Sequence, residues 1–351
     1  MRTPAKPQSR RRFLTQTTLA AGGLGLIVAN PSSAWAAPSP VIQTVLDPVS
    51  AERLGFTLVH EHVMCDFIGA EQTNRSRWDV ATVVRVMKPY LQALCERKVS
   101  TFIDCTPASI GRDPRVLKQL AQDTGLHIVT NTGYYGGAGD KFVPRHAYTE
   151  TADQLADRWV KEFETGIEDT GVKPGFIKTG VDEATGDPAR LSDIDAKLIR
   201  AAARTSRRTG LTAACHTGGG PAGLAATELF IAEGADPARF IVAHADGHGG
   251  EINRRIATLG AWVSFDALGY QSLAAHLKYI LPMLSQHTDR MLLSMDSGWY
   301  WVGETGGGKI RDYNYLTDTF LPALEKEGIA PAVIRRLTVD NPARAFGLIP
   351  R

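Results

Sequence analysis

The sequence is poor in cysteine: its 351 residues include only four, and their spacing shows no pairs. A domain built on disulfides needs a denser set, so we interpret these cysteines as reduced and mostly buried. Beyond residue 40 there is no run of about 20 apolar residues, which excludes a membrane-spanning helix there. The formal net charge of +2 gives no support to a nucleic-acid-binding surface.

The motifs of several enzyme classes are missing as well. No G-x-G-x-x-G follows the first apolar run, which argues against a dinucleotide-binding open sheet. There is no G-x-S-x-G elbow, and no Cys/His pair has the pattern of a nucleophile. Neither an internal repeat nor a Pro- or Gly-rich linker divides the chain. We therefore expect one domain.

The near-neutral charge hides a basic N-terminal segment. The stretch from Ser9 to Leu14 reads SRRRFL and matches the twin-arginine export pattern, and Ala34-Trp35-Ala36 has the form of a cleavage site. Removing residues 1–36 deletes five basic residues and no acidic one, which leaves a mildly acidic chain. We expect a signal peptide over 1–36, recognised by the twin-arginine translocase, and a periplasmic or secreted domain over 37–351 without stable membrane insertion. The alternative is a basic N-terminal tail.

The rest of the chain alternates short apolar runs with helical periodicity. The apolar runs cover residues 56–62, 101–106, 126–133, 175–180, 212–219, 239–247, 261–269 and 291–298. Helical periodicity is clearest over 79–99, 192–210 and 222–235. Eight strands that alternate with helices predict an α/β fold, a single (β/α)8 TIM barrel.

Residue types that bind metals follow or end five of these runs. They are His60, His62, Lys178, His216, His244 and Asp296. The C-terminal ends of barrel strands meet at one face, and strand alternation points His60 and His62 to the same side. A lone histidine is more often a core residue, but four of them on three strand ends predict a site for zinc or a similar divalent ion. A lysine directed into the same mouth is costly unless it is paired or chemically modified.

This set of residues, in this order, resembles the phosphotriesterase-like family of the amidohydrolase superfamily, which includes lactonases. The resemblance covers about residues 45–350 and is carried by VHEHV around His60, GFIKTG around Lys178, and NPARAF at Asn341–Phe346. It implies a hydrolase with two divalent metal ions and a water-derived hydroxide between them. The more buried ion would be bound by His60, His62 and Asp296, and the more exposed ion by His216 and His244. Lys178, carboxylated by CO2, would bridge the two ions, and Asp296 would accept a proton. The resemblance also implies a homodimer.

Aromatic residues follow two of the predicted strands. We expect Tyr134 and Tyr135 to contact substrate, because the family's lactonases tend to place a tyrosine beside the metals. Trp299 begins an aromatic stretch that precedes the glycine-rich segment 305–309, which indicates a partly apolar pocket under a movable lid. The alternative is that these side chains pack the loops onto the barrel.

The sequence departs from the specialised phosphotriesterases in one respect. No histidine follows strand 7, where that group has a proton relay; the chain instead reads Asp266-Ala267. Asp246 and Asp266 are left with open roles, as polar loop residues or as residues near the metals or the substrate. We interpret His248, His276 and His287 as surface or helix residues, and Arg112 as a candidate for an anionic substrate group.

The predicted function is metal-dependent hydrolysis of a small-molecule lactone or related ester, with promiscuous phosphotriesterase activity. One alternative is a dedicated phosphotriesterase (aryldialkylphosphatase). Another is an exported metal- or solute-binding protein without turnover, which the presence of both Lys178 and Asp296 argues against, because binding alone needs neither a bridging lysine nor a proton acceptor.

Overall fold

The computed structural model describes residues 39–184 and 186–348. The predicted signal peptide, residues 1–36, lies outside the described residues. Within the described part, no helix has both the length and the apolar composition that crossing a membrane requires.

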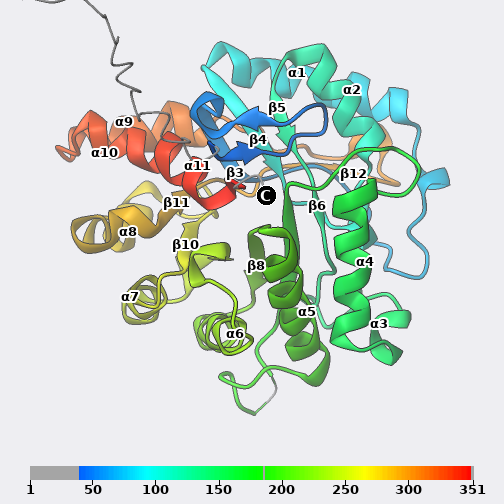
Figure 1. Ribbon diagram of the computed structural model, residues 1–351. Coiled ribbons are helices and arrows are strands. Elements are labelled where there is room, and N and C mark those ends of the chain that lie inside the picture. Colours follow the sequence, from blue (N-terminus) through cyan, green and yellow to red (C-terminus); the bar gives the residue numbers. More distant parts are fainter. Residues whose placement is uncertain (1–38, 185, 349–351) are drawn as a thin grey trace, which may run out of the picture. The chain divides into compact units, whose positions relative to one another are not determined.

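Eight parallel β segments surround a common interior, with helices on the outside (Figure 1). In chain order they are β3 (Phe56–Cys65), β4 (Val99–Asp104), β5 with β6 (His127–Val129 and Asn131–Thr132), β7 (Phe176–Val181), β8 (Ala213–Thr217), β9 (Phe240–Val242), β10 (Trp262–Phe265), and β11 with β12 (Met291–Leu293 and Gly298–Trp301). Every neighbouring pair is parallel, as helical crossovers require.

The hydrogen-bonded strands around the barrel form two parts, and the chain bridges both gaps between them. Between β5 and β6 only Thr130 is unpaired, so one chain segment bonds first to β4 and then to β7. Between β11 and β12 the N–H of Asp296 donates to His60 O at 3.1 Å, and the N–H of His62 donates to Ser297 O at 2.9 Å. The predicted (β/α)8 barrel is confirmed.

The outer helices bury one face each against the strands. They are α1 (Val80–Glu96), α2 (Pro114–Thr124), α4 (Ala152–Thr165), α5 (Asp193–Thr209), α6 (Gly220–Ala232), α7 (Gly250–Thr258) and α8 (Leu273–His287). The first residue before α5, Ser192, caps it by accepting the Asp195 N–H, and Gly210 ends it in the left-handed region at φ 81°. Leu198 and Ile199 of α5 are fully buried, as the periodicity of 192–210 predicts.

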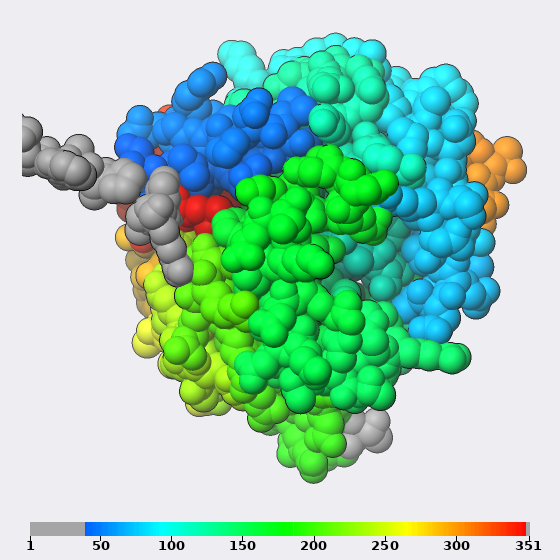
Figure 2. Space-filling model, turned by 45° about the vertical axis from the view of Figure 1, so that its right-hand side comes forward, coloured from blue at the N-terminus to red at the C-terminus, as the bar shows by residue number. Residues whose placement is uncertain are grey.

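Several short elements accompany the barrel strands and their helices. They are the hairpin β1 (Val41–Ile42) and β2 (Val49–Ser50), the single turn α3 (His146–Thr149), and the C-terminal helices α9 (Leu321–Lys326), α10 (Pro331–Arg335) and α11 (Asn341–Phe346). Figure 2 shows part of the red C-terminal segment between the blue segment near residue 50 and the yellow-green segment near residue 240, in agreement with the packing of α11.

The NPARAF motif forms α11 and closes the N-terminal end of the barrel. Its Phe346 is buried and meets Phe176 of β7 edge to face, with 5.6 Å between the ring centroids. Its Asn341 donates to Thr288 O and Met291 O, which fixes α11 to the start of β11. Apolar side chains such as Trp262 and Phe176 fill the barrel interior above it, so the cavity that opens between the strands lies at their C-terminal ends.

Candidate metal centre

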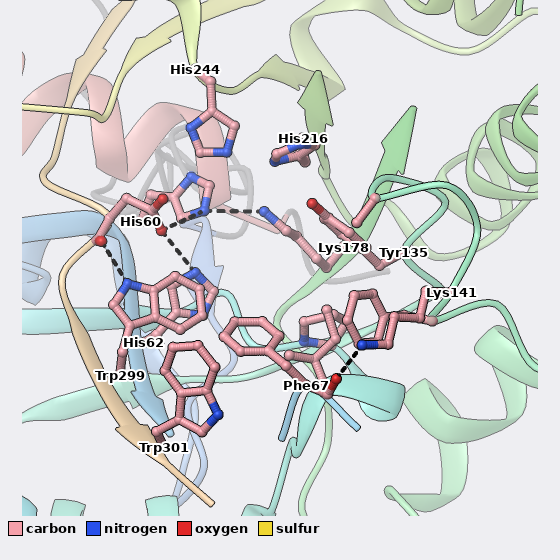
Figure 3. Close-up of a pocket in the computed structure, with 15 residues that line it drawn as sticks. His60, His62, Phe67, Tyr135, Lys141, Lys178, His216, His244, Trp299 and Trp301 are labelled. Carbon is pink, nitrogen blue, oxygen red and sulfur yellow. Dashed lines mark hydrogen bonds and ion pairs between the residues drawn. The ribbon is translucent and has the colours of Figure 1, made fainter. Parts of the chain in front are cut away.

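All six predicted ligands line one cavity of about 350 Å³ at the C-terminal ends of the strands (Figure 3). His60 and His62 are on β3, Lys178 is on β7 and His216 is on β8, whereas His244 follows β9 and Asp296 lies between β11 and β12. The register of β3 against β4 shifts between Leu58 and Glu61. Because of this irregularity Val59 reaches the barrel interior while both histidines line the cavity.

His60 and His62 present the same ring nitrogen to Asp296. The distances from Asp296 Oδ1 are 3.0 Å to His62 Nε2 and 3.8 Å to His60 Nε2. His60 Nδ1 lies 2.8 Å from Asp266 Oδ2, and His62 Nδ1 lies 2.9 Å from the hydroxyl of Thr106. That hydroxyl donates to Met64 O, so it accepts from His62. Both rings therefore carry the proton on Nδ1 and keep the Nε2 lone pair free.

Burial keeps these two rings neutral. His60 and His62 are 3% and 4% exposed. Burial lowers the pKa of His62 to about 3, although Asp296 acts in the opposite direction. Burial, together with Lys178, also lowers the pKa of His60. Neutral imidazole is the form that binds a metal.

The donor set fits a divalent cation. One ligand atom each from His60, His62 and Asp296 lies within 4.8 Å of the others. Asp296 Oδ1 is buried, and within the described residues it makes no regular hydrogen bond. Lys178 Nζ lies 3.1 Å from His60 Nε2, is only 2% exposed, and has no carboxylate oxygen of the described chain within 4.0 Å. The structure thus places the Lys178 amine in the same cavity wall as the imidazoles of the predicted ligands.

A second group of potential ligands, His60, His244 and Asp266, does not fit a metal as well. Asp266 is fully buried and already holds both rings, with 2.8 Å to His60 Nδ1 and 2.8 Å to His244 Nδ1. It also accepts the backbone N–H of His244. Burial alone would raise the pKa of Asp266, but His244 and His60 hold it well below its usual range. Asp266, whose role the sequence left open, positions one histidine from each side of the centre.

A further chain of hydrogen bonds supports Asp266. Asp246 Oδ2 accepts the N–H groups of Asp266 and Ala267 at 3.0 and 3.1 Å. The hydroxyl of Tyr279 on α8 lies 3.3 Å from the other Asp246 oxygen and 2.5 Å from His276 Nδ1. His276 is a helix residue, as predicted, but it is buried rather than at the surface. Asp246 therefore acts on the metal ligands through Asp266.

Glu61 is a supporting residue that sequence reasoning missed. It accepts hydrogen bonds from Ser294 Oγ, from the Met295 N–H and from the Ser297 N–H, at 2.7–3.0 Å. Burial raises its pKa to about 8, against the effect of those hydrogen bonds. These contacts hold the chain on both sides of Asp296. The available signal was an acidic residue between two histidines on a strand that is otherwise buried.

The backbone at the centre is strained. Asp296, His244 and Trp299 have φ values of 50°, 61° and 72°, in the left-handed region that non-glycine residues rarely adopt. The Asp296 carbonyl accepts from Tyr270 Oη at 2.9 Å and from Trp299 Nε1 at 2.8 Å. Such conformations persist only where the surrounding structure imposes them. At Asp296 the hydrogen bonds from Tyr270 and Trp299 do so.

The His216 side of the centre is more open. His216 meets His244 with 4.4 Å between ring centroids and Tyr135 with 4.9 Å. Both histidines are partly exposed. Burial lowers the pKa of His216 well below its usual value. For His244 the effect of burial is outweighed by Asp266, which raises its pKa.

Of the three predicted substrate residues, the structure brings two to the cavity. Tyr135 and Trp299 line it together with Phe67, Phe142 and Trp301, and Trp299 stacks on His62 at 3.7 Å between ring centroids. Tyr134 does not line it.

The prediction for Tyr134 is corrected. Its hydroxyl lies 2.9 Å from His146 Nε2, and its ring packs on Trp159 of α4. Consecutive residues of an extended chain point to opposite sides, so only one of the two tyrosines can reach the cavity.

Arg112 and His248 bond to other parts of the barrel and do not line the cavity. Arg112 is buried, donates to both carboxylate oxygens of Glu162 and to Asn131 O, and does not line the cavity. Its interpretation as a substrate-binding residue is therefore corrected. His248 is buried, and its Nε2 lies 2.8 Å from Thr217 Oγ1.

Comparison with known proteins agrees with this geometry. Residues 40–346 match the phosphotriesterase family. The phosphotriesterase homology protein of Escherichia coli (strain K12) is 31% identical over 305 residues, which cover 85% of this chain and 100% of that protein. The phospho-furanose lactonase of Mycoplasmopsis synoviae (strain 53) is 27% identical, with coverage of 87% and 91%.

A solved structure has the same fold. The organophosphorus hydrolase from Deinococcus radiodurans superposes with a TM-score of 0.78 at 30% identity and covers 89% of this chain and 99% of that one. Sequence and fold thus match over nearly the whole barrel, and the chain belongs to the phosphotriesterase family.

Proposed function

We propose that this metal-dependent hydrolase opens a lactone or a related carboxylic ester, with phosphotriester hydrolysis as a slower side activity. The observation that carries the proposal is the pair of Nε2 atoms of His60 and His62 facing Asp296 Oδ1, under a cavity wall made mostly of aromatic side chains.

The chain's own residues divide the work. His60, His62 and Asp296 would hold one ion, His216 and His244 a second, and a carboxylated Lys178 would bind both. Two divalent ions, zinc or a similar metal, would supply an acidic water and polarise the ester carbonyl. Asp296 is positioned to accept the proton from that water, because its carboxylate faces the cavity while its backbone is fixed by Tyr270 and Trp299.

The cavity wall supports a substrate with an apolar part. Phe67, Phe142, Trp299 and Trp301 form one side of it, and Tyr135 beside His216 forms another. Apolar walls with a few polar groups are typical of small-molecule sites. We propose that Tyr135 and Trp299 contact the substrate next to the scissile bond.

A dedicated phosphotriesterase is the second candidate, and the similarity to an organophosphorus hydrolase favours it. Against it, Ala267 follows the buried Asp266, so the relay histidine of the specialised enzymes has no counterpart here. When a lactone opens, Asp296 would pass its proton to the leaving alkoxide. An aryl phosphotriester instead releases a phenolate that does not take up this proton, so the proton must reach water without that relay.

A substrate panel tests the proposal. Purified metal-loaded protein would be assayed on aliphatic lactones, aryl esters and aryl dialkyl phosphates, and kcat/KM compared. We expect the highest value for a lactone. A phosphotriester that exceeds every lactone would establish the second candidate. Asp296→Asn, which should keep its metal, is the control that assigns the activity to this site.

We also propose that the protein is exported through the twin-arginine pathway to the periplasm or medium. The SRRRFL motif and the Ala-x-Ala site support this. Replacing Arg10 and Arg11 by lysine in the full chain should shift the protein to the cytoplasmic fraction, and an unchanged distribution would refute the proposal.

A further inference from the structure

A second cavity lies at the opposite end of the barrel and is larger than the catalytic one. Its volume is about 640 Å³, and the two cavities have no lining residue in common. Its wall comes from the residues that precede β9 and β11, from the start of β10, from α10 and α11, and from the N-terminal residues around Ala51. Four arginines line it: Arg239, Arg290, Arg335 and Arg344.

Two of these arginines lie against one indole ring. The guanidinium carbons of Arg290 and Arg344 are 5.0 and 5.5 Å from the ring centroid of Trp262. The Trp262 side chain is buried and donates its Nε1–H to Ala238 O. The ring therefore holds two positive charges near each other, and a cation–π contact offsets only part of the cost of that arrangement.

The arginines differ in their partners. Arg335 pairs with Asp340 at 3.4 Å. Arg239 donates to the Gly347 carbonyl. Within the described chain no carboxylate oxygen lies within 4.0 Å of the guanidinium nitrogens of Arg239, Arg290 or Arg344. Three cations thus share one cavity without a direct counter-charge.

The acidic residues of the cavity wall do not neutralise the positive charge of these three arginines. Asp340 is used by Arg335, and Asp236 accepts the Ala238 N–H. Glu52 and Asp236 lie beyond ion-pair distance of the three arginines. Burial lowers the pKa of both Arg239 and Arg290, in spite of Asp236 nearby.

We infer that this cavity binds a phosphate-type oxyanion, as the free ion or as a phosphomonoester. Guanidinium groups present planar pairs of N–H donors that match phosphate oxygens, and three of them from separate elements face one space. The volume admits a ligand larger than the inorganic ion. The site is independent of the proposed hydrolytic reaction.

The position of the site accounts for a part of the NPARAF motif that catalysis does not use. Asn341 and Phe346 fix α11 to the barrel, while Arg344 is the exposed residue between them. The fixed helix therefore places Arg344 beside Trp262, and its guanidinium group lies over that ring, facing the cavity where an anion would bind.

The test is calorimetric titration of the metal-loaded protein with inorganic phosphate at constant ionic strength. We expect saturable binding that weakens at least about tenfold in Arg239→Gln/Arg290→Gln, and also in Arg344→Gln alone. The matched control is Arg335→Gln, which removes the paired arginine of the same cavity and should change the affinity less than about twofold.

The design separates this site from the catalytic centre. Any phosphate bound at the metals remains in all variants, so only the difference between variants reports on the arginine cavity. Unchanged melting temperature and metal content in the variants would show that they are folded. Equal phosphate affinity in the wild type and in both test variants would overturn the inference, and so would tighter binding of succinate than of phosphate.

Discussion

The two halves of the metal centre are built differently. His60 and His62 are buried, and each has its Nδ1 fixed by a separate acceptor, Asp266 or Thr106. His216 and His244 are partly exposed; His244 shares Asp266 with His60, and the His216 ring makes no hydrogen bond within the described residues. Outer partners fix the direction and the tautomer of a ligand. The fold therefore fixes the ligands of the inner half more tightly, and we expect an ion bound at the outer half to exchange more readily.

Removal of Lys178 should affect both halves of the centre together, because its side chain lies between them. We expect Lys178→Ala to lose most of both ions and to reduce kcat by about 10³-fold or more, since metal activation of water is worth several kcal/mol. Metal content by mass spectrometry and initial rates measure this. Lys141→Ala, in the same cavity wall, should keep both ions. Two retained ions in the Lys178 variant would contradict the bridging role.

Among residues 39–184 and 186–348, Asp266 is the outer partner that contacts a histidine of each half. Asp266→Asn cannot accept from two Nδ1–H groups equally, so we expect metal affinity to fall about 10–100-fold at both positions. Titration with a chelator, followed by metal content, would report the two losses. Tyr279→Phe, which reaches Asp266 indirectly through Asp246, should have a smaller effect. A loss confined to the His244 side would show that the two halves are not coupled through Asp266.

Thr106 serves only the inner half. Thr106→Val removes the acceptor of His62 Nδ1, and we expect a loss of about tenfold in affinity for the inner ion alone. In the wild type the outer ion should leave at the lower chelator concentration. In the variant the two release curves should move together, and curves that keep their separation would contradict the assignment.

We expect the smallest effect, a change in the pH dependence of stability, from Asp195, which lies beside the loop that covers the outer half. It is 2% exposed on α5 and lies so close to Gly136 that a Cβ there would collide with it. Gly136 adjoins Tyr135, which covers His216. Burial and the neighbouring Asp140 raise the pKa of Asp195 from 3.8 to about 7.

The sign of the resulting pH dependence follows from that shift. The folded protein binds more protons than the unfolded chain between about pH 4 and pH 7. The stability that Asp195 contributes is therefore complete below pH 4 and is lost as the pH rises through 7. Urea unfolding at several pH values should show a shallower decline in Asp195→Asn than in the wild type. Parallel declines would contradict it.

The fold and the ligands could be predicted because both leave local signals. Alternating apolar runs define the barrel, and the ends of its strands place His60, Lys178 and His216 on one face. The contacts of Asp266 and Thr106 could not be predicted, because they join strands far apart in sequence. The positions of Tyr134 and Tyr135 depend on the local direction of the chain after β6, which periodicity does not determine.

Asp296, His244 and Trp299 have left-handed backbone conformations. Their strain lowers the stability of the fold, but their side chains serve the centre. Glycine at any of these positions would remove the strain of the left-handed backbone, but it would also remove a side chain that the centre uses. Selection for thermal stability alone would therefore favour substitutions that relieve this strain, and those substitutions would inactivate the enzyme. Improvement of the enzyme requires that turnover be selected in every round.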